Sequence, residues 1–193
     1  MKFDAVRIRE GIGSYLRIQD MAQRPNFCTE TFKKAYKGFY RVRQKPADWY
    51  ACYFNLLAEQ REKNRTLKEL LEIMYENTGE VHPSFCSKLI ATMNPDKPIW
   101  DKYVLQWLGF VGDGPKDPRD KIAYFAGIYS QIEKELNEHM SDKNVLQALD
   151  EFDRLIPQGR NISKMKKLDF MLWSNRSDRT VSILDYNKLL EDK

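Results

Sequence analysis

The chain has 193 residues, of which 42% are hydrophobic and 31% charged, and its formal net charge is +4. Its 10 Phe, 10 Tyr and 4 Trp exclude a disordered chain, because they supply the apolar surface that repays the entropy of folding. The presence of only 9 Gly and 8 Pro argues against collagen-like, low-complexity and turn-dense β architectures. We therefore expect a single domain over residues 1–193, since domains average roughly 150 residues.

Apolar residues recur every three or four positions along most of the chain, which is typical of helices with one buried face. The sequence therefore predicts an all-α domain of about eight to ten helices with almost no strand. A short extended piece is expected over 180–183 and a last helical turn over 185–190. In chain order, the helices are expected over 3–21, from a cap at Thr29 or Thr31 to 41, and over 46–65, 66–79, 84–93, 101–108, 118–140, 144–156 and 163–173.

Residues typical of helix ends divide this pattern. Pro46 is expected at the first position of its helix, where the missing N–H has no intrahelical partner to lose. Thr66 and Glu69 have the spacing of a capping box. Gly79 suits the left-handed conformation that ends a helix. Asp101 stands at the start of a helix, where a carboxylate accepts backbone N–H bonds and stabilises by about 1 kcal/mol.

The sequence indicates a cytoplasmic protein without membrane partners or cofactors. Its apolar runs are shorter than the roughly 18 residues of a membrane span, and charges stand where a signal peptide needs an apolar core. Three widely spaced cysteines, Cys28, Cys52 and Cys86, are expected as reduced core thiols. No metal site is expected, because the only histidines, His82 and His139, lie far apart and no close Cys or His pair exists.

Charge is distributed unevenly along the chain. Residues 33–45 contain six bases and no acid, residues 113–154 contain ten acids and six bases, and residues 160–179 contain six bases and two acids. Two basic segments flanking an acidic one can mark a nucleic-acid surface, although such a run can equally be a solvated helix face. The residues expected to contact DNA phosphates are Lys33, Lys34, Lys37, Arg41, Lys164, Lys166 and Lys167.

The stretch from Gly79 to Val104 places a helix between two turns and presents Asp101 after Pro98-Ile99-Trp100. The segment Pro98-Ile99-Trp100-Asp101-Lys102-Tyr103-Val104 resembles the motif that carries an essential Asp in the helix-hairpin-helix DNA glycosylase superfamily. The chain also resembles a group of uncharacterised bacterial proteins remotely similar to that superfamily. The segments that carry this second resemblance are Ser84-Phe85-Cys86-Ser87-Lys88-Leu89, Asn94-Pro95, Trp100-Asp101 and Lys167-Leu168-Asp169-Phe170-Met171-Leu172-Trp173.

The resemblance implies a helix-hairpin-helix glycosylase-like fold, duplex DNA as a partner and Asp101 as a catalytic residue of a monofunctional base-excision hydrolase. The chain departs from the superfamily in two ways. One hairpin glycine, Gly79, is kept and lies next to Glu80, and Ser84 or Phe85 stands where bifunctional members have a Schiff-base lysine. These departures favour a DNA-interacting protein that is catalytically silent, with Asp101 as a helix cap and Lys88 as a surface or capping lysine.

An alternative from another class is a non-enzymatic protein-interaction module. In that interpretation the basic helix docks on the acidic segment, residues 113–154, of a partner or of a second copy.

Overall fold

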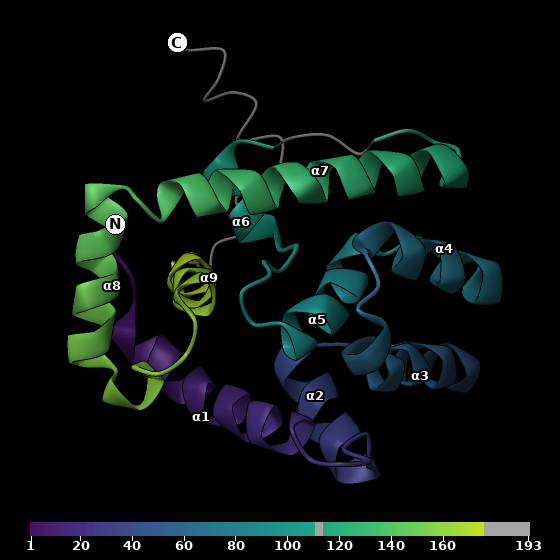
Figure 1. Ribbon diagram of the computed structural model, residues 1–193, viewed down its shortest axis with the longest axis horizontal. Coiled ribbons are helices and arrows are strands. Elements are labelled where there is room, and N and C mark those ends of the chain that lie inside the picture. Colours follow the sequence, from purple (N-terminus) through teal and green to yellow (C-terminus); the bar gives the residue numbers. More distant parts are fainter. Residues whose placement is uncertain (111–113, 176–193) are drawn as a thin grey trace.

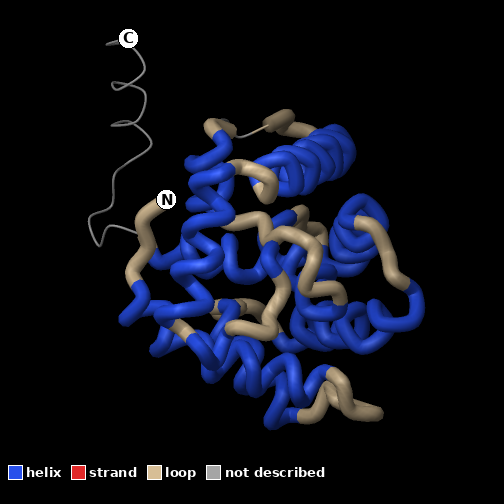
Figure 2. Tube along the Cα trace, turned by 60° about the vertical axis from the view of Figure 1, so that its left-hand side comes forward, coloured by secondary structure: helices blue, strands red, loops and turns tan. Residues whose placement is uncertain are grey.

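The computed structural model describes residues 1–110 and 114–175, and within these ranges it contains helices and loops but no strand (Figures 1 and 2). The all-α prediction is thereby confirmed. The expected elements over 180–183 and 185–190 lie outside the described residues. The described helices are α1 (Ala5–Ala22), α2 (Glu30–Tyr40), α3 (Ala47–Lys63), α4 (Leu67–Thr78), α5 (Pro83–Met93), α6 (Lys102–Leu108), α7 (Pro118–His139), α8 (Lys143–Leu155), the short 3-10 helix η1 (Pro157–Gly159) and α9 (Lys164–Ser174).

Helix ends lie close to where the sequence predicts them. Thr29 caps α2, since its side chain accepts from the Phe32 N–H, and Thr66 and Glu69 form the expected capping box of α4. Gly79 ends α4 with a φ of +69°. Pro46 was expected inside its helix, but it is the residue before α3, with an extended ψ of 166°. Its carbonyl accepts from Tyr50, so the helical residues begin at Ala47.

Buried side chains form two hydrophobic clusters. The first joins α2, α3, α4 and α5 with the end of α1, and the second joins the start of α1 with α8 and α9. The long helix α7 runs along both groups and contributes Tyr129 to the first cluster and Ile132 to the second (Figure 1). Phe39 and Trp100 pack against both clusters. The space between the clusters is therefore bounded by aromatic side chains.

Hydrogen bonds tie the start of α1 to the end of α9. The Asp4 N–H donates to Ser174 Oγ over 3.0 Å, across 170 positions of sequence, and Arg7 Nη1 donates to the Ser174 carbonyl over 3.1 Å. Farther along α1, the Tyr15 ring meets the Phe170 ring edge-on at 5.6 Å between centroids. These contacts make α1 and α9 neighbours over much of their length.

Two remaining sequence expectations concern thiols and membrane spans. Cys86 is buried, whereas Cys28 and Cys52 are partly buried against the first cluster, and all three are free thiols. None of the described helices has the length and hydropathy needed to cross a bilayer.

Candidate functional site

A cavity of about 340 Å³ lies where the two clusters meet. Its walls come from α1, from the end of α2, from α5, from the segment before α6 and from α9. The side chains combine aromatic rings with charged groups, which is typical of a site that both packs and orients a small ligand. The lining residues are Gly11, Gly38, Phe39, Tyr40, Arg41, Lys88, Ile99, Asp101, Lys166, Asp169, Phe170 and Trp173.

The segment that carries Asp101 is held on both sides. The Trp100 N–H donates to Ser87 Oγ over 2.9 Å, and the Tyr129 hydroxyl donates to the Pro98 carbonyl over 2.8 Å. Ile99 between them is 6% exposed. Neighbouring helices α5 and α7 thus fix the position at which the chain delivers Asp101 to the cavity.

Asp101 caps α6 and lines the cavity at the same time. Its Oδ1 accepts from the Tyr103 N–H over 2.9 Å, which confirms the expected cap. Burial raises the pKa of this carboxyl, while the Tyr103 N–H bond and the nearby Lys88 ammonium act in the opposite direction. A partly buried carboxyl with a raised pKa can accept a hydrogen bond or a proton from a ligand.

Lys88 is partly buried and lines the cavity, rather than lying on the surface as we expected. Its ammonium donates to Ser84 Oγ over 3.3 Å and lies 5.1 Å from the centroid of the Phe85 ring. Burial lowers the pKa of Lys88, and the Asp101 carboxylate opposes this shift. The sequence holds the missed signal: Lys88 is the only charged residue of α5, and a helix with so few strongly polar residues is buried on most sides.

Lys166 and Lys167 do not form the DNA-contacting surface that the sequence suggested, because each is only 5% exposed. Lys166 forms an ion pair with Asp169, and its ammonium lies 5.0 Å from the Tyr15 ring centroid. Lys167 pairs with Asp153 over 2.6 Å. Both ammonium groups therefore have partners inside the molecule, and Lys166 lines the cavity instead of the outer surface.

The other expected phosphate contacts are on or near the surface. Lys33 pairs with Glu30 over 2.8 Å. Lys164 is exposed at the first position of α9 and does not line the cavity. Gly38 lines both the cavity and a shallow depression next to it, which several basic side chains surround. We call these side chains the basic rim: Lys34, Lys37, Arg41 and Arg43.

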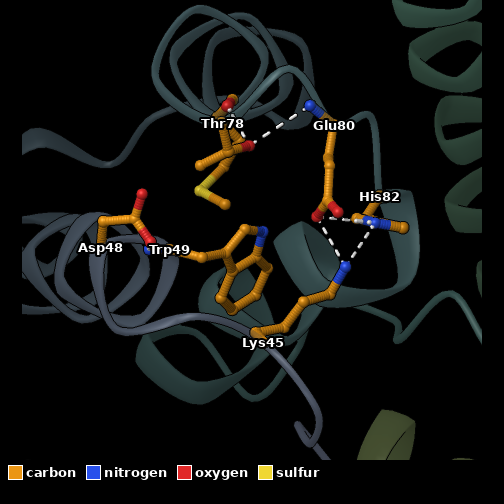
Figure 3. A network of polar contacts seen from close by, with 7 residues as sticks. Lys45, Asp48, Trp49, Thr78, Glu80 and His82 are labelled. Atoms are coloured by element: carbon orange, nitrogen blue, oxygen red, sulfur yellow. Dashed lines mark hydrogen bonds and ion pairs between the residues drawn. The ribbon is translucent and has the colours of Figure 1, made fainter.

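The last base of the acid-free run takes part in a separate network, shown in Figure 3. Lys45 Nζ lies 2.6 Å from Glu80 Oε2 and 3.0 Å from His82 Nε2, and His82 Nε2 lies 3.1 Å from the same Glu80 oxygen. Burial and the Lys45 ammonium lower the pKa of His82. The network joins the α2–α3 loop to the α4–α5 turn and keeps Lys45 out of the basic rim.

Within residues 1–110 and 114–175, no group of His, Cys, Asp and Glu side chains could hold a metal ion. Comparisons with protein-family models, with curated proteins and with solved structures give no match for this chain.

Proposed function

We propose that the chain is a DNA-interacting protein of the helix-hairpin-helix glycosylase-like class. The basic rim contacts the phosphates of duplex DNA, and the cavity receives one nucleobase turned out of the duplex. The observation that carries this proposal is that Arg41 of the basic rim lines the cavity, and that Gly38 lines both the cavity and the depression beside the rim. Phosphates bound along the rim would therefore place a nucleotide at the mouth of the cavity.

The chemistry of the cavity supports a base as its ligand. Proteins hold an extruded base by stacking it against aromatic side chains and by hydrogen bonds to its Watson–Crick edge. Phe39, Phe170 and Trp173 supply aromatic surface, and Asp101 and Lys88 supply an acceptor and a donor. Binding in this form needs no bond cleavage and does not depend on the Schiff-base lysine of the bifunctional members.

Binding through the rim would be strongly dependent on salt. Each neutralised phosphate contributes about 0.9 to the slope of log affinity against log salt. Three contacts would therefore weaken binding about 40-fold between roughly 50 and 200 mM salt. Fluorescence anisotropy with a labelled duplex measures this slope directly.

The experiment compares two charge reversals of equal size. In the test variant Lys34, Lys37 and Arg41 are changed to Glu, and in the control the exposed Lys68, Lys134 and Lys143 are changed to Glu. We expect the test variant to lose duplex binding and the control to keep most of it. Equal losses in both variants, or no binding by the wild type at low salt, would refute the proposal. Self-association without DNA binding would favour the interaction module.

A second variant separates base capture from phosphate binding. Gly38 lines the cavity, and a Cβ at this position meets no atom within 4 Å, so a leucine there can be accommodated and would narrow the opening. We expect Gly38→Leu to bind duplex DNA but to lose the fluorescence increase of a 2-aminopurine placed next to an extruded guanine. Gly13→Leu, in α1 and outside the cavity lining, is the matched control. An unchanged signal in Gly38→Leu would show that the base does not enter the cavity.

A further inference from the structure

The charged side chains that line the cavity differ in whether their charge is balanced by an ion-pair partner or by solvent. Lys166 and Asp169 neutralise one another in an ion pair, and Arg41 is exposed. Lys88 and Asp101 are both partly buried, and within the described part of the chain neither forms an ion pair. Lys88 and Asp101 are therefore a partly buried cation and a partly buried anion of the cavity that lack a direct ion-pair partner among the described residues.

Of these two side chains, Lys88 has more hydrogen-bonding capacity left unused. An ammonium has three N–H donors, and the one hydrogen bond described for Lys88, to Ser84 Oγ, is long at 3.3 Å. Asp101 uses Oδ1 for the cap of α6, which leaves Oδ2 available to a ligand. Burying charged groups with so few partners costs stability, and such costs are typical of positions kept for binding.

We infer that the cavity selects a base with a lactam edge, such as hypoxanthine or guanine, with Lys88 donating to the carbonyl oxygen and Asp101 accepting from the ring N–H. The inference rests on the proposed base-binding function and adds the class of base. A lactam places an acceptor next to a donor, which matches an ammonium beside a carboxylate. In paired DNA, lysine likewise donates to guanine O6 from the major groove, whereas Asn or Gln reads adenine there. Adenine has an amino group where hypoxanthine has its carbonyl. That amino group is a hydrogen-bond donor, as is the Lys88 ammonium, so the two could not form a hydrogen bond.

The test uses two duplexes that differ in one base. Hypoxanthine or adenine is placed opposite a tetrahydrofuran abasic analogue. Neither purine is then base-paired, so the cost of extruding each one does not include the breaking of a base pair. We expect wild-type protein to bind the hypoxanthine duplex about 5- to 100-fold more tightly than the adenine duplex, the discrimination of one well-formed base contact.

Lys88→Met keeps the length of the side chain and removes its donors. We expect this variant to bind both duplexes with equal affinity, to bind a fully paired duplex like the control, and to melt no lower than wild type. Lys68→Met, which removes an exposed lysine of α4, is the control for net charge and should keep the preference.

The outcomes separate this inference from the proposed function. Equal wild-type binding of both duplexes would overturn the lactam preference and leave DNA binding intact. A preference that persists in folded Lys88→Met would overturn the assignment of Lys88 as the donor. A wild type that binds neither duplex would refute the proposed function itself, and the inference with it.

Discussion

Asp101 combines a cap and a cavity-lining carboxylate in one side chain, and two substitutions separate them. Asn caps a helix about as well as Asp, whereas Ala removes the cap at a cost of about 1 kcal/mol. We therefore expect Asp101→Asn to unfold close to wild type and Asp101→Ala to unfold at lower urea concentration.

The same variants test catalysis at Asp101. We expect no release of bases from duplexes by the wild type or by Asp101→Asn, because the helix cap and a hydrogen bond to a bound base account for the residue without catalysis. If wild type excises a base and the folded Asn variant does not, Asp101 is a catalytic base and the protein is a hydrolase.

At the scale of elements, the short helix η1 is packed so closely that it requires a glycine. A Cβ at Gly159 would overlap Ile12 and lie 2.9 Å from Phe152 Cε1. We expect Gly159→Ala to lower the free energy of unfolding by about 1–3 kcal/mol through overpacking. Gly127, in the middle of α7, has open space around it, so Gly127→Ala should instead stabilise by about 0.5–1 kcal/mol. Urea denaturation measures both changes, and a neutral Gly159→Ala would contradict this packing.

The network of Lys45, Glu80 and His82 makes the junction of two loops sensitive to acid. The folded protein lowers the pKa of His82 below the ordinary 6.5, so the unfolded chain binds a proton that the folded chain does not. Stability from this group is present above about pH 6.5 and is lost as the pH falls below it. The Lys45 ammonium also lowers the pKa of Glu80, whose contribution is lost at more acidic pH.

His82→Gln should therefore remove part of this pH dependence. We expect the denaturation midpoint of wild type to fall more between pH 7.5 and 5.5 than that of the variant, measured in matched buffers. Equal falls would show that His82 titrates alike in the folded and unfolded chains.

Local features of the sequence were enough to predict most helices and their caps. The capping box at Thr66 and the left-handed Gly79 depend on neighbours three or four residues away, and both were predicted correctly. Pro46 was misplaced by one residue because proline suits both the position before a helix and its first turn.

At the scale of the whole molecule, burial was harder to predict than helix formation. Lys166 and Lys167 belong to a basic stretch, yet the packing of α1, α2 and α8 against α9 buries them. Of the rings around Lys166, Phe170 is on the same helix, but Tyr15, Phe39 and Tyr40 lie more than 120 positions earlier in the chain. Asp101 was identified from its local motif, whereas its neighbour Lys88 was not, because the cavity that joins them exists only once both clusters have formed.

The hydrogen bond between Asp4 and Ser174 determines when the start of α1 can fold during synthesis. A ribosome makes Asp4 170 positions before Ser174, so the apolar side chains at the start of α1 are covered only after most of the chain has been made. In the meantime the first cluster, whose helices α2 to α5 are close in sequence, can form early because its loops are short. Nascent chains stalled so that a linker fills the exit tunnel and Asn94 lies outside the ribosome should therefore protect α3 and α4 from protease while the start of α1 is still cleaved. Protection of the start of α1 is expected only when α9 has left the ribosome.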